Sequence, residues 1–270
     1  CPERDHVELI DTDYAHHIVP TFQSRGLVHE PGGSADPGVR TYSWAGAREP
    51  IDWRRWDLVE ESSSEGHHLV YRSRRLTGEE NLEITVTYDL PEQGYLIDYR
   101  VAVKNVGDER EELAPRFSVV QPIAPAASRY GSSTTPFQDK GGKAKDWPIA
   151  KIDKKRMIRD EENLVRFAGI TDRYFMTALV PAEQPVAYEA APIGWIDAEG
   201  LELLDKEPPV GVDEEPPNKA YRSTLLLAER SLGPGDTENF EFKVYIGPKG
   251  LADMKELELG LEDTVQYGVF

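Results

Sequence analysis

The side chains that could do chemistry show none of the spacings that catalytic or cofactor sites need. Cys1 is the one cysteine of the chain, so an intrachain disulfide is excluded and no thiol catalysis or cysteine-based metal site is expected. No Gly-x-Ser-x-Gly elbow is present for a serine nucleophile. The run Gly141-Gly142-Lys143 lacks the spacing of a phosphate-binding loop. The sequence therefore predicts no catalytic residue and no cofactor.

The six histidines are the remaining candidates for metal ligands or proton-transfer groups. His16-His17 and His67-His68 are adjacent pairs, and neighbours in a strand point to opposite faces, so neither pair is expected to hold one ion. The 49 Asp and Glu residues offer many acid-base pairs, but their order along the chain does not bring two together. We expect no metal site and no enzyme, with a mutarotase-type aldose epimerase as the alternative.

Tryptophans near the N-terminal third could form a binding surface. Trp44, Trp53 and Trp56 lie close to Arg48 and to the pair Arg54-Arg55. Such a group suits stacking on a sugar, contact with a peptide, or packing at the rim of a β-sandwich. Rim packing is the favoured interpretation, and a carbohydrate- or peptide-binding module stays open as an alternative.

The chain is acidic, with 31 Lys and Arg against 49 Asp and Glu and a formal net charge of -18. Such a charge repels phosphate backbones and argues against nucleic acid as a partner. Residues 139–159 hold eight Lys and Arg against three Asp, and residues 197–215 hold eight acidic residues against Lys206. Both stretches are interpreted as solvated loops, or as docking surfaces for a partner or for anionic lipid head groups.

Alternating apolar residues predict two half-buried strands joined by a turn at residues 91–94. The first carries Leu82, Ile84, Val86 and Tyr88, and the second carries Ile97, Tyr99, Val101 and Val103. Further strands are expected at residues 8–10, 69–74, 113–120, 164–170, 174–181, 186–190, 222–228 and 240–246. Many short strands, separated by turns rich in Gly and Pro, favour an all-β antiparallel sandwich.

The C-terminal stretch changes its period. Apolar residues fall three or four positions apart after residue 248, which predicts a helix with one buried stripe made of Leu251, Met254, Leu257, Leu261 and Val265. Gly260 weakens a helix interior, so two short helical pieces are expected. Residues 131–148 and 204–219 are expected to be irregular loops. No apolar run approaches the roughly 18 residues of a membrane-spanning helix.

Several phrases, in order along the chain, resemble the large periplasmic domain of YidC-type membrane protein insertases. Phe22-Gln23-Ser24-Arg25-Gly26-Leu27 resembles a Gln-Ser-Gly-Leu phrase of that family, with Arg25 as an extra residue. Residues 172–181, which read Asp-Arg-Tyr-Phe-Met-Thr-Ala-Leu-Val-Pro, resemble its Tyr-Phe-x-x-Ala-x-x-Pro strand. Residues 244–249, which read Val-Tyr-Ile-Gly-Pro-Lys, resemble its Tyr-x-Gly-Pro-Lys phrase. Residues 130–159 match the family poorly.

The resemblance implies an antiparallel β-supersandwich, similar to galactose mutarotases, with a C-terminal α-helical segment. On this basis residues 1–247 are expected to form the periplasmic sandwich, and residues 248–270 a helical linker to a membrane-embedded insertase domain. The implied function is that of a non-enzymatic accessory domain on the periplasmic face of the bacterial inner membrane. It would support the insertion and folding of inner-membrane proteins. Cys1 fits either a lipid-modified N-terminus or a point of truncation.

The resemblance also implies partners. These are the SecD/SecF and SecYEG subunits of the Sec translocon, nascent membrane protein clients and the transmembrane domain of the same polypeptide. The family's SecF-contact region falls on residues 56–107, which are expected to form an edge of the sandwich. Trp56, Tyr99 and Trp195 are the candidate residues for a partner contact or a cleft.

Overall fold

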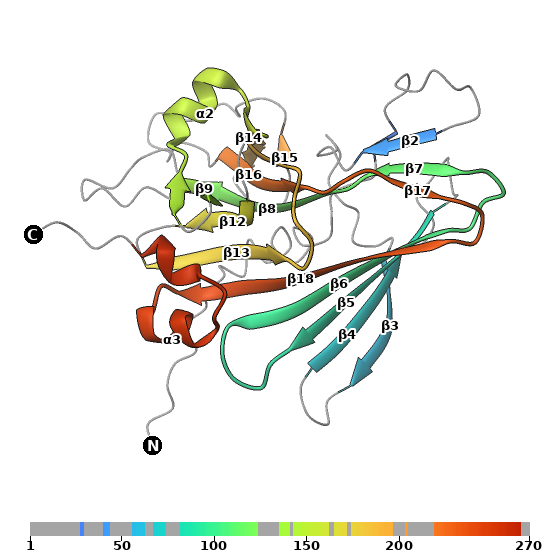
Figure 1. The fold of residues 1–270 in the computed structure, drawn as a ribbon, viewed down its shortest axis with the longest axis horizontal. Coiled ribbons are helices and arrows are strands. Elements are labelled where there is room, and N and C mark those ends of the chain that lie inside the picture. Colours follow the sequence, from blue (N-terminus) through green and yellow to red (C-terminus); the bar gives the residue numbers. More distant parts are fainter. Residues whose placement is uncertain are drawn as a thin grey trace, which may run out of the picture.

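Strands and two short helices make up the part of the chain that the computed structural model describes (Figure 1). The described residues are 28–29, 40–43, 56–62, 67–73, 82–123, 135–140, 143–161, 165–171, 174–196, 203–204 and 219–265. The strand predicted at residues 8–10 lies outside them. The all-β antiparallel class predicted from the sequence is confirmed.

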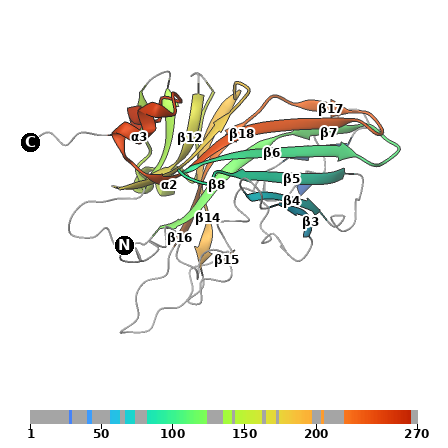
Figure 2. The same cartoon turned by 90° about the horizontal axis from the view of Figure 1, so that it is seen from below.

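The largest layer is an antiparallel sheet of nine strands. Across the sheet the order is β10 (Ala144–Asp146), β9 (Thr135–Lys140), β12 (Val165–Thr171), β13 (Phe175–Pro181), β18 (Thr237–Pro248), β6 (Leu96–Asn105), β5 (Leu82–Leu90), β4 (His67–Ser73) and β3 (Trp56–Ser62). The central strand β18, 12 residues long, pairs with β13 on one side and β6 on the other. The C-terminal helices lie at one end of the molecule and β3 and β4 at the other (Figure 2).

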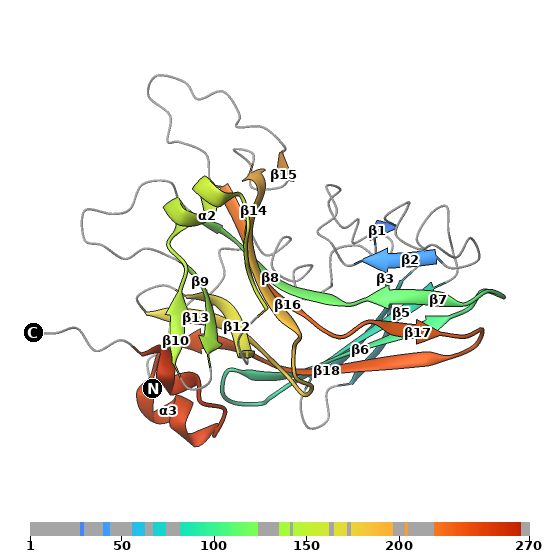
Figure 3. The same cartoon turned by 45° about the horizontal axis from the view of Figure 1, so that its top comes forward.

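Two smaller sheets complete the fold (Figure 3). The five-stranded sheet has the order β11 (Ile158–Asp160), β14 (Ala187–Ile196), β16 (Lys219–Leu226) and β8 (Arg116–Ile123), with β15 (Leu203–Leu204) paired to β14. The four-stranded sheet has the order β1 (Val28–His29), β2 (Arg40–Ser43), β7 (Glu111–Ala114) and β17 (Arg230–Leu232). Strands β2 and β7 pair in parallel, while the other strand pairs are antiparallel.

The main core lies between the nine-stranded and five-stranded sheets, because each contributes one row of apolar side chains to it. The Phe117 ring of β8 lies 4.4 Å from that of Phe242 and 5.2 Å from that of Phe240, both on β18. The alternating residues Leu82 to Tyr88 of β5 are buried as well, which confirms the predicted hairpin of β5 and β6. Burial of each large apolar side chain contributes about 1.5–3 kcal/mol.

A second core covers the opposite face of the nine-stranded sheet. Helix α3 (Leu251–Glu256) and the 3-10 helix η2 (Leu261–Thr264) follow β18 directly. Met254 and Leu261 are fully buried against Phe137, Phe167 and Tyr245 of the sheet. The helical segment is therefore in two pieces, packed on the sheet rather than projecting from it.

Gly260 separates the two helical pieces, and no other residue type fits there without strain. Its φ of 75° lies in the left-handed region, and a Cβ atom would lie 2.8 Å from Arg166 Nη1. Arg166 Nε in turn donates to the buried Asp139 Oδ2 at 2.6 Å, and its Nη2 to Asp263 Oδ2 at 2.9 Å. Arg166 thus ties strand β9 to η2 across this glycine.

Three sequence-based expectations need correction. The single strand predicted at 113–120 is two strands in different sheets, because Pro115 between β7 and β8 lacks the N–H that would continue the first ladder. The loop predicted at 131–148 contains β9 and β10, where buried Gln138 and Asp139 hide the alternation of a strand. The helix α2 (Ile149–Lys155) was missed, since Ile152 is its one buried residue.

The second core predicts that its C-terminal cover stabilises the sandwich. Leu261→Ala removes a fully buried side chain and should lower the free energy of unfolding by about 2–5 kcal/mol, measured by urea denaturation. Glu256→Ala, at an exposed position of α3, is the control and should stay within about 0.5 kcal/mol of wild type. Coinciding midpoints for Leu261→Ala and wild type would contradict the packing.

Candidate functional site

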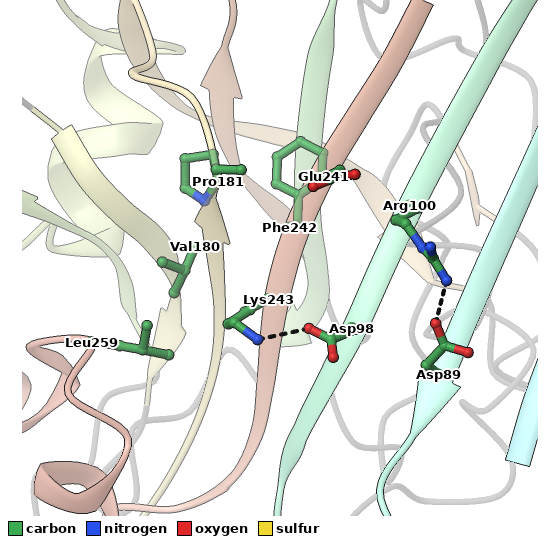
Figure 4. A pocket seen from close by; sticks show the side chains of 10 residues that line it. Asp89, Asp98, Arg100, Val180, Pro181, Glu241, Phe242, Lys243 and Leu259 are labelled. Atoms are coloured by element: carbon green, nitrogen blue, oxygen red, sulfur yellow. Dashed lines mark hydrogen bonds and ion pairs between the residues drawn. The ribbon is translucent and has the colours of Figure 1, made fainter. Parts of the chain in front are cut away.

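A groove of about 480 Å³ opens on the outer face of the nine-stranded sheet, beside the C-terminal segment (Figure 4). Its lining comes from β5, β6, β13, β18 and the loop after α3, and consists of Asp89, Asp98, Arg100, Val180, Pro181, Ala182, Glu241, Phe242, Lys243 and Leu259. The groove lies where the sheet passes from its covered part to its uncovered part. It is the candidate functional site.

Strand alternation places the charges of the groove. Asp98 and Arg100 flank the buried Tyr99 on β6, and Glu241 and Lys243 flank the buried Phe242 on β18. In the register of these strands Asp98 pairs with Lys243, and Arg100 with Glu241. Opposite charges therefore face each other across the strands, an arrangement that stabilises a strand pair.

The charged wall is a set of ion pairs at the surface. Lys243 Nζ donates to Asp98 Oδ1 at 2.8 Å, with both side chains about half exposed. Arg100 Nη2 donates to Asp89 Oδ2 at 2.5 Å, and His68 Nδ1 contacts the other oxygen of Asp89. Exposed pairs of this kind contribute roughly 0–1 kcal/mol each. They fix the pattern of charge on this wall more than they hold the fold together.

The Asp89 carboxyl has a lowered pKa. Burial raises this pKa and is the largest single influence, but the hydrogen bonds from His68 and Arg100 and the charges of these partners lower it and together prevail. A carboxylate that keeps its charge in this way is an anchor for cations and a poor general acid near neutral pH.

The opposite wall is apolar. Val180 and Leu259 line the groove and also pack against the second core, and Pro181 follows Val180 on β13 (Figure 4). One charged wall and one apolar wall suit an extended segment with alternating polar and apolar side chains. Among the lining residues no nucleophile lies beside a general base, so the arrangement favours binding over catalysis.

The candidate contact residues from the sequence do not come together. Tyr99 is a correction: its side chain is fully buried, with its ring 5.2 Å from Tyr88 and 5.9 Å from Phe242, so it is a core residue. Trp56 belongs to β3, the last strand in the nine-stranded order, and Trp195 belongs to β14 in the other sheet. Trp44 and Trp53 lie outside the described residues.

The predicted helix stripe faces the sheet. Met254 and Leu261 are fully buried, Leu257 and Val265 pack against the same core, and Leu251 is half-buried. Leu259 is a groove residue that sequence reasoning missed. It lies between Glu258 and Gly260, both with positive φ, and Gly260 was the one available signal of a turn there.

The described residues contain no group of three or more His, Cys, Asp and Glu that could hold a metal ion. The groove lining brings no pair of histidines together with a glutamate, which the aldose-epimerase alternative requires. None of the helices in the described part has both the length and the apolar character needed to cross a bilayer.

Comparison with known proteins finds a family. A family model described as the YidC periplasmic domain matches residues 41–270. The membrane protein insertase YidC of Bordetella parapertussis is 24% identical over 219 residues, which cover 74% of this chain and 34% of the relative. The same protein of Bordetella pertussis is 26% identical over 228 residues, with the same coverage. The chain thus spans about a third of the length of these curated relatives.

Solved structures resemble the fold at low identity. A galactose mutarotase-like protein from Lactobacillus casei has a TM-score of 0.44 at 12% identity, covering 71% of this chain and 72% of that one. A GH36 alpha-galactosidase, AgaB, from Geobacillus stearothermophilus has a TM-score of 0.44 at 14% identity, covering 75% and 27%. Likeness at this level says nothing about a sugar ligand for this chain.

The lowered pKa of Asp89 predicts a dependence of stability on pH. A carboxyl with a depressed folded-state pKa stabilises the fold above its ordinary pKa of ~3.9, and this contribution is lost as the pH falls through the folded-state pKa. Asp89→Asn should therefore lower the free energy of unfolding at pH 6, and by less at pH 3, in urea denaturation. Arg100→Gln should weaken the pH dependence in part. An equal effect of Asp89→Asn at both pH values would contradict this.

Proposed function

The chain belongs to the family of YidC periplasmic domains, and from this membership we propose that it is the periplasmic accessory domain of a membrane protein insertase. The match over residues 41–270 is the observation that carries the proposal. In this role the domain lies at the periplasmic face of the bacterial inner membrane and supports the insertion and folding of inner-membrane proteins. It performs no covalent chemistry itself.

The C-terminal segment links the sandwich to the membrane-embedded part of the same polypeptide. The curated relatives are about three times as long as their match to this chain, which leaves room for such a part. Since α3 and η2 are packed on the sheet through Met254 and Leu261, the link would be rigid at its start.

Docking to the Sec accessory subunits SecD and SecF, and through them to SecYEG, is the finer part of the proposal. Of residues 56–107, strands β5 and β6 lie inside the nine-stranded sheet and supply its core, so removing that hairpin would unfold the domain. Among the described strands, β3 ends the sheet order instead. An edge strand can accept another strand through its backbone groups, and so we place the contact at β3.

Strand β3 also carries features that limit unspecific pairing of an edge. Its register with β4 shifts between Leu58 and Glu60, and its sequence includes Asp57, Glu60 and Glu61. An irregular, acidic edge resists self-association and selects partners with a complementary edge. This supports a specific partner over a general holding surface for clients.

The groove is the proposed contact for client segments. Its charged wall of Asp98, Lys243 and Arg100 would pair with polar residues of an extended client, while Val180 and Leu259 would cover apolar ones. Such a surface can hold a segment briefly without burying a long apolar stretch. It would then release that segment toward the membrane.

Site-specific photo-crosslinking in the full-length insertase tests the docking surface. A benzoylphenylalanine at Glu60 or, separately, at Glu61 of β3 should give adducts with SecF or SecD, because neighbouring positions of a strand sample both of its faces. The same probe at Glu256, exposed on α3, is the matched control and should give none. Adducts from Glu256 and none from β3 would remove the assignment to this edge.

A further inference from the structure

Three arginines surround one buried glutamate on the five-stranded sheet, on the side that faces away from the main core. On β14 the neighbours Tyr188 and Ala190 belong to that core, and Glu189 between them points to the opposite side. Arg159 on β11 is the direct cross-strand partner of Glu189. Arg222 of β16 and Arg116 of β8 reach the same carboxylate from the other strands of the sheet. We call these three side chains the arginine triad.

The triad encloses Glu189 at short range, and this one carboxylate has fewer acceptor positions than the three guanidiniums have donors. Arg159 Nη1 lies 3.3 Å from Glu189 Oε1, and Arg116 Nη1 lies 3.5 Å from Oε2. The Glu189 side chain is 1% exposed, so solvent does not reach its carboxylate. A carboxylate has two oxygens, whereas three guanidiniums carry fifteen N–H donors between them.

Arg222 is the least satisfied of the three. Its Nη2 atom comes no closer than 4.0 Å to Glu189 Oε2, which is beyond hydrogen-bonding distance. Its Nε atom is buried and has no hydrogen-bond partner among the described residues, although the side chain is 15% exposed. Buried donors without an acceptor are costly, so a guanidinium in this state calls for an acceptor.

The charge balance points the same way. Among the described residues, the three guanidiniums pair with two carboxylates, Glu189 and the rim residue Glu161, which bonds Arg159 at 2.5 Å, so within that part of the chain one positive charge is left over. Burial lowers the pKa of Arg222, Glu189 raises it, and the like charge of Arg116 lowers it again. This surplus stands out in a chain whose net charge is -18.

The cluster is open on one side. Arg159 is 43% exposed and Arg116 is 21% exposed, so solvent reaches the triad between β11 and β8. On the same face Ser118 and Thr224 share a hydrogen bond of 2.8 Å between their hydroxyls, and Thr224 is the cross-strand partner of Glu189. Hydroxyl donors next to guanidiniums are typical of sites for oxyanions.

We propose that the arginine triad binds a phosphate group, either free or as part of an esterified ligand such as a lipid head group. A tetrahedral oxyanion offers several acceptors to planar guanidiniums and can accept two parallel N–H bonds from one arginine. It would supply the partner that Arg222 lacks and offset the surplus charge. The site is separate from the groove and does not rest on the proposed insertase role.

Phosphate titration of the 270-residue chain tests the proposal, and a titration with chloride at equal ionic strength is the reference. Wild type should bind inorganic phosphate saturably in calorimetry. Arg222→Gln and, independently, Arg116→Gln should weaken binding at least tenfold. Arg110→Gln removes an exposed arginine that donates to Ser231 at another edge, and as the matched control it should bind like wild type.

Glu189→Gln separates a phosphate site from a purely structural ion cluster. Removing the competing negative charge should strengthen phosphate binding several-fold, whereas a cluster that only holds the strands together would bind no phosphate in either form. If Glu189→Gln fails to fold, the two arginine variants decide. The proposal is overturned if wild type shows no saturable phosphate binding, or if Arg222→Gln binds phosphate as wild type does.

Vesicles then identify the source of the phosphate. Binding to phosphatidylglycerol vesicles that is lost in Arg222→Gln, together with no binding to phosphatidylcholine vesicles, assigns the site to anionic lipid head groups. Saturable binding of inorganic phosphate without vesicle binding assigns it to a soluble phosphate compound. Either result supports the phosphate site, and the calorimetric comparison above remains the result that can refute it.

Discussion

The architecture depends on one constraint: part of the nine-stranded sheet is apolar on both faces and must be covered twice. On β18, Phe242 and Val244 point into the main core, while Tyr245, the residue after Val244, points into the second core. The five-stranded sheet covers the first face. The C-terminal α3 and η2 cover the second, so the last described residues are part of the packed body.

That constraint also explains where the groove forms. Strands β5 and β6 alternate between apolar and polar side chains, and their outer face needs no cover. Leu259 is the residue of the C-terminal segment that lines the groove, and the charged residues of β6 and β18 line the same groove. A groove with one apolar wall and one charged wall is the boundary between these two kinds of sheet surface.

The alternation of apolar and polar residues along the sequence predicted the position of individual strands, because that alternation is a local property. The alternation of Leu82 to Tyr88 and of Phe240 to Val244 was enough to place β5 and β18. It was not enough for β9, whose buried Asp139 is neutralised by Arg166 from another strand. Neither the groove nor the arginine triad could be predicted from the sequence, because both depend on contacts between distant strands. Asp98 and Lys243 meet across 145 positions of sequence, and the arginine triad gathers side chains from three strands. Both sites are created by the pairing of strands, and the two-residue alternation within a strand does not specify which strands pair.

The contact between Gly260 and Arg166 constrains how the sequence can diverge. The guanidinium occupies the space of a Cβ atom at position 260, and the backbone there is left-handed. A side chain at 260 would push this guanidinium away from Asp139 and Asp263 and would also strain the backbone, whereas a lineage without the arginine gains room and needs only a residue that tolerates that backbone, such as asparagine. Changes at positions 166 and 260 should thus be correlated in evolution.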